Sequence, residues 1–166
     1  MSREVRMVPS WWRHPKDENG HFIPLLGDSF KESVAKWDEV ARQWKNGFVR
    51  DYATDKWKPR DPNQSTFEED EGTRPEEADY MPEWSQGVRT HCQMYETTNE
   101  GEPISPVLET PEELARWLVE NNASAFGNRG ATYEQWLATI KHGWAISAIF
   151  SPKTGLVSGV EGLHSK

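Results

Sequence analysis

The sequence predicts an α+β fold: a small antiparallel sheet with about three helices and one long acidic irregular segment. Three segments begin with a capping residue and continue with apolar side chains at helical spacing. Residues 88–96 alternate in polarity as a strand does. The chain has 166 residues, which fits one domain covering 1–166.

The first helix is predicted from about residue 30 to residue 46. Ser29 can cap it, and Glu32 stands in the capping-box position. Gly47 follows as a natural end. One apolar stripe runs along this helix, made of Phe30, Val34, Trp37, Ala41 and Trp44.

Two further helices are predicted by the same signals. One begins at Thr110 with Glu113 in the box position, and the other begins at Thr132 with Gln135 in that position. Gly143 ends the later helix. Extended segments are expected at residues 5–8, 21–26, 88–96 and 104–108, and a final hairpin at 144–150 and 156–160.

Residues 50–87 read as a long irregular segment, because four prolines interrupt them. A loop of this length is usually functional or disordered, and we expect ordered ends with a mobile middle near residues 64–74. Its acidic core is predicted as a partner-binding surface, formed by Glu68, Glu69, Asp70 and Glu71.

The distribution of charged residues along the chain limits the classes of partner that it can be expected to bind. The chain has a net charge of −8, and residues 61–120 alone carry 16 acidic and 3 basic side chains. This surplus argues against binding of a nucleic-acid backbone by the acidic segment. It suits a host protein with a basic surface, and it equally suits a solvated loop that keeps the chain soluble.

The sequence also predicts a location. A single cysteine, Cys92, excludes an internal disulfide and fits a reducing compartment. The first residues lack the apolar core of a signal peptide, and no run approaches the ~20 apolar residues of a membrane helix. We therefore expect a cytoplasmic protein without a membrane partner.

Motifs for catalysis, metals and phosphate loops are missing from the sequence, so no cofactor is predicted. Cys92 alternates with apolar neighbours and is expected to be a buried, inert thiol. An enzyme remains an alternative, with polar candidates at Arg89, His91, Tyr95 and Glu96.

The nine tryptophans are the most unusual feature of the composition. Trp11, Trp12 and Trp84 lie outside the predicted helices and could line a pocket for a flat ligand. They could equally seal a core that is short of leucine and isoleucine. Arg129 lies in a glycine-rich turn before the third helix, which suits either an anion site or a simple flexible connection.

Several stretches together resemble a family of small accessory proteins encoded by tailed bacteriophages and prophages. These are WRHPKD at 12–17, FIPL at 22–25, DYMPEW at 79–84, MYET at 94–97, GEPISP at 101–106, EELARWL at 112–118 and GLVSGVE at 155–161. The resemblance would cover nearly the whole chain, and it implies no catalytic residues. It implies a phage protein that acts in the bacterial host cytoplasm.

The function expected first is therefore a host–virus interaction: a binding protein that antagonises a host factor, such as a defence factor, by protein–protein contact. The alternative is a sponge for a nucleotide or similar small molecule, which the tryptophans and Arg129 would bind. An enzyme with an unrecognised site comes third.

Overall fold

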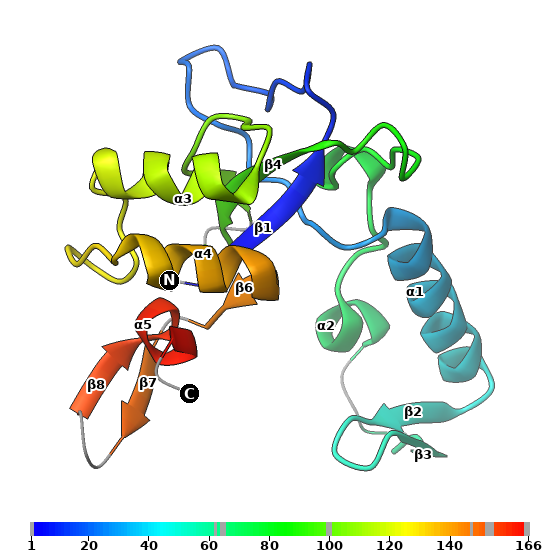
Figure 1. Cartoon of the computed structure of the whole chain (residues 1–166). Coiled ribbons are helices and arrows are strands. Elements are labelled where there is room, and N and C mark those ends of the chain that lie inside the picture. Colours follow the sequence, from blue (N-terminus) through cyan, green and yellow to red (C-terminus); the bar gives the residue numbers. More distant parts are fainter. Residues whose placement is uncertain are drawn as a thin grey trace. The chain divides into compact units, whose positions relative to one another are not determined.

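The computed structural model describes residues 2–61, 63, 66–98, 101–146, 148–151 and 155–164 (Figure 1). The chain divides into two compact units. Unit 1 consists of Met1–Gly27 together with Pro82–Lys166, and unit 2 consists of Asp28–Met81. The predicted α+β class is confirmed, because a four-stranded antiparallel sheet occurs together with α-helices.

The sheet of unit 1 has the strand order β5-β4-β1-β6. Its central pair is formed by β1 (Arg3–Val8) and β4 (His91–Glu96), which run antiparallel in a register that places Arg6 opposite Gln93. The edges are short, with β5 at Glu102–Pro103 and β6 at Trp144–Ala145. Residues 104–108 continue beside β4, where Leu108 forms an isolated bridge with Cys92.

Two predicted helices of unit 1 are confirmed with their caps. α3 (Pro111–Glu120) begins with the Thr110 capping box, and α4 (Tyr133–His142) begins with the Thr132 capping box. Gly143 ends α4 in the left-handed conformation. These two helices lie side by side in Figure 1 and pack against each other.

One face of the sheet packs against these helices and forms the core of unit 1. Alternation along β4 directs Cys92 and Met94 to this face. They join buried side chains from α3, α4 and the C-terminal segment, namely Leu114, Ala115, Leu118, Ala125, Trp136, Ile140, Ala145 and Val160. The expected burial of Cys92 is confirmed, and burial raises the pKa of its thiol to about 11.

Two side chains on the opposite face of β4 are also buried, which alternation in polarity did not predict. Gln93 and Tyr95 point away from the core, yet Gln93 is 5% exposed and Tyr95 is fully covered. Their cover comes from the segment that follows β1, residues 9–27. Trp12 and His14 of this segment are hydrogen-bonded to or packed against Tyr95.

The chain ends in a hairpin and a short helix. β7 (Ala148–Ser151) pairs with β8 (Gly155–Ser158), so a C-terminal hairpin forms, but its strands differ from the expected 144–150 and 156–160. Residues 144–145 instead form β6 and pair with β1, and residues 159–160 belong to the helix that follows. Residues 152–154 of the predicted turn lie outside the described residues. The chain then continues into α5 (Gly159–His164), which the sequence did not predict because two glycines and a short length weaken the helical pattern.

Unit 2 is organised around α1 (Phe30–Lys45), the predicted first helix, whose first turn is capped by Ser29. Its aromatic stripe packs as expected: Trp37 and Trp44 both contact the ring of Phe67, and Phe30 contacts Tyr80. Each of these contacts has a centroid separation between 5.1 and 5.5 Å.

The segment 50–87 contains more regular structure than the sequence predicts. β2 (Phe48–Asp51) and β3 (Lys56–Pro59) form a hairpin, and α2 (Phe67–Glu71) and a single 3₁₀ turn, η1 (Glu77–Asp79), follow. Pro59 is compatible with β3 because it is the last residue of the strand. Thr66 is the N-cap residue of α2, the helix that the acidic run forms. Of the expected mobile middle, residues 64 and 65 lie outside the described residues.

Among the helices that the structure describes, none is both long enough and apolar enough to cross a bilayer.

Candidate functional site

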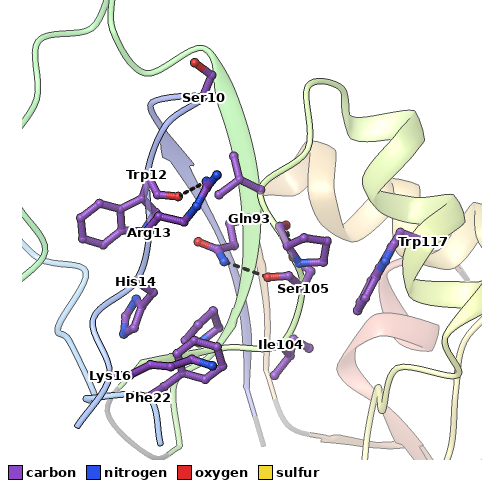
Figure 2. A pocket seen from close by; sticks show the side chains of 13 residues that line it. Ser10, Trp12, Arg13, His14, Lys16, Phe22, Gln93, Ile104, Ser105 and Trp117 are labelled. Atoms are coloured by element: carbon purple, nitrogen blue, oxygen red, sulfur yellow. Dashed lines mark hydrogen bonds between the residues drawn. The ribbon is translucent and has the colours of Figure 1, made fainter. Parts of the chain in front are cut away.

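A pocket of about 710 Å³ lies in unit 1, between segment 9–27, strand β4 and the residues that connect β5 to α3. Figure 2 shows Trp12, Arg13 and His14 on one side of it and Trp117 of α3 on the other. The lining consists of Ser10, Trp12, Arg13, His14, Lys16, Phe22, Gln93, Pro103, Ile104, Ser105, Pro106, Val107 and Trp117.

Segment 9–27 contains a tight turn that folds it back on itself. The Asn19-Gly20 pair reverses the chain, with Gly20 at φ 84° and Asp17 Oδ1 accepting from the backbone N–H of Asn19 and His21. The turn brings Phe22 back beside Lys16, whose ammonium lies 4.5 Å from the Phe22 ring centroid. Both side chains thereby line the pocket.

A chain of buried hydrogen bonds forms the floor of the pocket, and we call it the Tyr95 network. Trp12 Nε1 donates to the Tyr95 hydroxyl at 3.1 Å, and this hydroxyl donates to Gln93 Oε1 at 2.8 Å. Gln93 Nε2 then donates to the Ser105 carbonyl at 2.8 Å. The network fixes the pocket-lining side chains of Trp12 and Gln93, because each polar atom that moves would lose a buried partner.

His14 completes the Tyr95 network from segment 9–27. Its Nδ1 lies 3.2 Å from the Tyr95 hydroxyl, and its Nε2 lies 2.7 Å from the Ile23 carbonyl oxygen. Burial lowers the pKa of His14, opposed by the Ile23 hydrogen bond, while the Arg6 charge lowers the pKa and Glu102 raises it. Burial is the largest of these influences, so the pKa of His14 at the pocket wall lies below the ordinary value of histidine.

Arg6 supports Tyr95 from the side of β1. Its guanidinium carbon lies 4.3 Å from the centroid of the Tyr95 ring, and its Nη1 donates to the Leu25 carbonyl at 2.7 Å. Burial raises the pKa of Tyr95 to about 12, so the phenol stays protonated and acts as a hydrogen-bond donor.

The pocket wall carries positive charge, whereas the chain as a whole carries a net negative charge. Arg13 and Lys16 are exposed cations, His14 adds a titratable ring, and none of the thirteen lining side chains is a carboxylate. The whole chain has a net charge of −8. A cationic cavity in an acidic protein favours an anionic ligand.

The three predicted ligand tryptophans lie together in the structure. Trp84 contacts Trp12 with ring centroids 4.8 Å apart, and it contacts Trp11 at 6.4 Å. Only Trp12 lines the pocket, whereas Trp11 is 61% exposed. Arg129, the fourth predicted ligand residue, lies in the connection between α3 and α4 and is outside this lining.

The predicted partner-binding carboxylates all lie on α2 or at its end, in unit 2. Glu69 is part of the capping box with Thr66, and Glu71 accepts from the Tyr52 hydroxyl at 2.8 Å. Glu68 and Asp70 are exposed to solvent. Glu69 and Glu71 therefore take part in contacts within unit 2, and all four carboxylates lie on one short helix.

The arrangement suits binding better than covalent chemistry. The hydroxyl of Ser105 accepts from the Met94 N–H and donates to the Pro106 carbonyl, so its proton already has an acceptor. The enzyme candidates Tyr95, Glu96 and His91 are separately engaged, since Glu96 pairs with Arg3 and His91 with Thr90. Within the described residues, no group of three or more His, Cys, Asp or Glu side chains could hold a metal ion.

Sequence reasoning missed most of this site, including His14, Lys16, Phe22, Gln93, Ser105 and Trp117. They meet only because segment 9–27 folds back across β4. One local signal was available: residues 11–16 combine two tryptophans, an arginine, a histidine and a lysine in a chain that is otherwise acidic.

No protein-family model, no curated protein and no solved structure matches this chain.

Proposed function

We propose that this chain is a phage-type accessory protein that binds a small molecule in the pocket of unit 1. The ligand we propose has a flat aromatic part and an anionic part, as a nucleotide has, and binding takes place in the bacterial host cytoplasm. The sequence resemblance supports the phage setting, and the chemistry of the pocket supports the class of ligand.

The observation that carries this proposal is the charge of the pocket wall. Arg13, Lys16 and His14 face the cavity without a carboxylate among the lining residues. Phosphate groups are bound in proteins by such side chains because cations and N–H donors replace the hydration of the anion.

Aromatic side chains supply the second part of the argument. Trp12, Phe22 and Trp117 line the same cavity, and the planar faces of nucleobases stack on rings of this kind. A volume of about 710 Å³ falls in the range of cavities that hold small ligands. The pocket therefore combines the size, the apolar rings and the positive charge that a nucleotide needs.

A thermal-shift panel of nucleoside mono-, di- and triphosphates, cyclic nucleotides and dinucleotides tests the proposal. A ligand at 100 times its dissociation constant stabilises the fold by about 2.7 kcal/mol. We expect at least one stabilising nucleotide, and a roughly tenfold loss of affinity in the double variant Arg13→Gln, Lys16→Gln. Arg129→Gln is the matched control, because it removes an exposed arginine outside the pocket. A flat panel would contradict the proposal.

A second candidate function is antagonism of a host protein with a basic surface. It rests on α2, whose carboxylates Glu68 and Asp70 are exposed and whose Glu71 accepts from Tyr52, an aromatic side chain that is 68% exposed. Exposed aromatic residues next to charge are typical of interface hot spots.

Affinity capture from host lysate tests this candidate. The double variant Glu68→Gln, Asp70→Asn is expected to capture less of the host protein, and the capture that remains should depend less on salt. Glu69 is left unchanged, so the capping box of α2 stays intact. Glu112→Gln and Glu120→Gln on α3 form the matched control, because they remove two exposed charges from the other unit. Capture that depends equally on both pairs would contradict a specific role for α2.

A further inference from the structure

The Tyr95 hydroxyl is surrounded by partners whose roles are fixed. The Ser105 carbonyl can only accept, so Gln93 must turn its amide N–H toward it and its Oε1 toward Tyr95. Tyr95 therefore donates its one proton to Gln93. Trp12 Nε1 can only donate, so it fills one lone pair of the hydroxyl oxygen.

This arrangement leaves one remaining role for His14 Nδ1, which is to donate to the second lone pair of the Tyr95 oxygen. The other ring nitrogen, Nε2, faces the Ile23 carbonyl, which again can only accept. Both nitrogens of His14 thus face acceptors. Only the imidazolium carries a proton on both, so only the cation satisfies every hydrogen bond of the network.

The neutral ring must leave one buried hydrogen bond unmade. If the proton stays on Nε2, Nδ1 faces the Tyr95 oxygen without a proton. If Tyr95 turns its proton to Nδ1, Gln93 Oε1 loses its donor. An unmet buried polar group is costly, so the network favours the protonated ring.

The surroundings of the ring oppose that preference. Burial disfavours the charge, and so does Arg6 of β1, whereas the Ile23 hydrogen bond and Glu102 of β5 favour it. Two more cations, Arg13 and Lys16, line the pocket beside His14 on the same segment. What the protonated ring lacks is a negative charge in the pocket itself.

We propose that the pocket takes up its anionic ligand together with one proton, which is held on His14. This inference rests on the proposed function, because the ligand supplies the missing negative charge. The bound anion and the imidazolium stabilise each other, and the Tyr95 network then has every donor and acceptor paired. Affinity consequently rises as the pH falls, because the complex binds more protons than the free protein.

The test uses sulfate as the anionic probe, because its charge does not change between about pH 5 and about pH 8, where histidine titrates. The ¹⁵N shifts of the histidine side chains of the full chain are followed against pH in sodium sulfate and in sodium chloride at equal ionic strength. We expect the titration midpoint of His14 to rise by roughly 0.5 or more in sulfate. The signals of the other histidine side chains report any general effect of the salt and serve as the internal control.

Two variants make the result specific. The double variant Arg13→Gln, Lys16→Gln is expected to abolish the sulfate effect, whereas Arg129→Gln should retain it. A midpoint of His14 that is the same in both salts, or a rise no larger than the general effect of the salt, would overturn the proposal.

The outcomes separate this inference from the proposed function. A stabilising nucleotide combined with an unchanged His14 midpoint would overturn proton uptake and leave nucleotide binding standing. A flat nucleotide panel combined with a rise in sulfate would support a proton-coupled anion pocket and contradict the nucleotide class. Failure of both measurements would overturn both proposals.

Discussion

Tyr95 donates its hydroxyl proton to Gln93 Oε1 at 2.8 Å, between two side chains on the same face of β4. The bond joins residues two apart in a strand, so both point toward segment 9–27 and away from the apolar core. This face of the sheet is consequently closed by a group of hydrogen-bonded polar side chains.

Replacement of Tyr95 by phenylalanine is expected to lower the free energy of unfolding by about 1–3 kcal/mol. The change removes one oxygen and leaves Trp12 Nε1 and Gln93 Oε1 without their buried partner. Urea denaturation measures the effect. Tyr133→Phe, a partly buried tyrosine outside the network, should cost less, and an equal cost would argue against the network.

The Arg3–Glu96 pair provides a second test. The Arg3 side chain is 2% exposed, and its Nη1 lies 3.2 Å from Glu96 Oε2. Glu96→Gln is expected to destabilise the fold by about 3 kcal/mol or more, because it leaves a buried guanidinium without its counter-charge. Thermal unfolding is the measurement. Glu112→Gln, which removes the exposed partner of Lys141, is the control and should change stability far less.

Two glycines with positive φ allow backbone strain to be separated from steric crowding. A Cβ on Gly101 would lie directly against the Leu25 carbonyl oxygen, whereas a Cβ on Gly20 would meet nothing within 4 Å. Gly20→Ala is expected to cost about 1 kcal/mol from conformation alone. Gly101→Ala should lower the free energy of unfolding clearly more, because its Cβ also displaces the Leu25 carbonyl. Equal losses of stability would show that segment 9–27 can move to make room for the Cβ.

Alkaline pH should destabilise the protein through Cys92. Burial raises the pKa of this thiol from 9.0 to about 11, so the folded state holds a proton that the unfolded state releases. Stability is then expected to fall as the pH rises from about 9 toward about 11. Cys92→Ala should flatten this part of the pH profile in chemical denaturation. An unchanged slope would place the alkaline loss elsewhere, for example on Tyr95.

The three longer helices could be predicted from sequence because their signals are local. A capping residue, an apolar period and a closing glycine or asparagine lie within a few turns, and α1, α3 and α4 begin where these signals occur. The strand at β4 was also visible, although it begins later than expected, at His91. Local propensity and tertiary packing agree in these elements.

The candidate site could be predicted only in part, because its residues come from distant positions. The grouping of Trp12 with Trp84 followed from their place outside helices, and the structure brings them into contact. The partners of Tyr95 could not be deduced, because pairing of β1 with β4 is a contact over about 90 residues that no local pattern specifies. Arg129 was chosen for its glycine-rich turn, which forms a connection outside the pocket.

The order of the strands in unit 1 has a consequence for folding during synthesis. β1 is made first, yet it lies between β4 and β6, and Arg3 pairs with both Glu96 and Ala145. Because a ribosome adds about 5–20 residues per second, β1 would wait several seconds before its neighbouring strands β4 and β6 are synthesised. Unit 2, which is continuous from Asp28 to Met81, has all its strands and helices long before unit 1 does. We therefore expect the inserted unit to fold during translation and the pocket to close only after the chain is nearly complete.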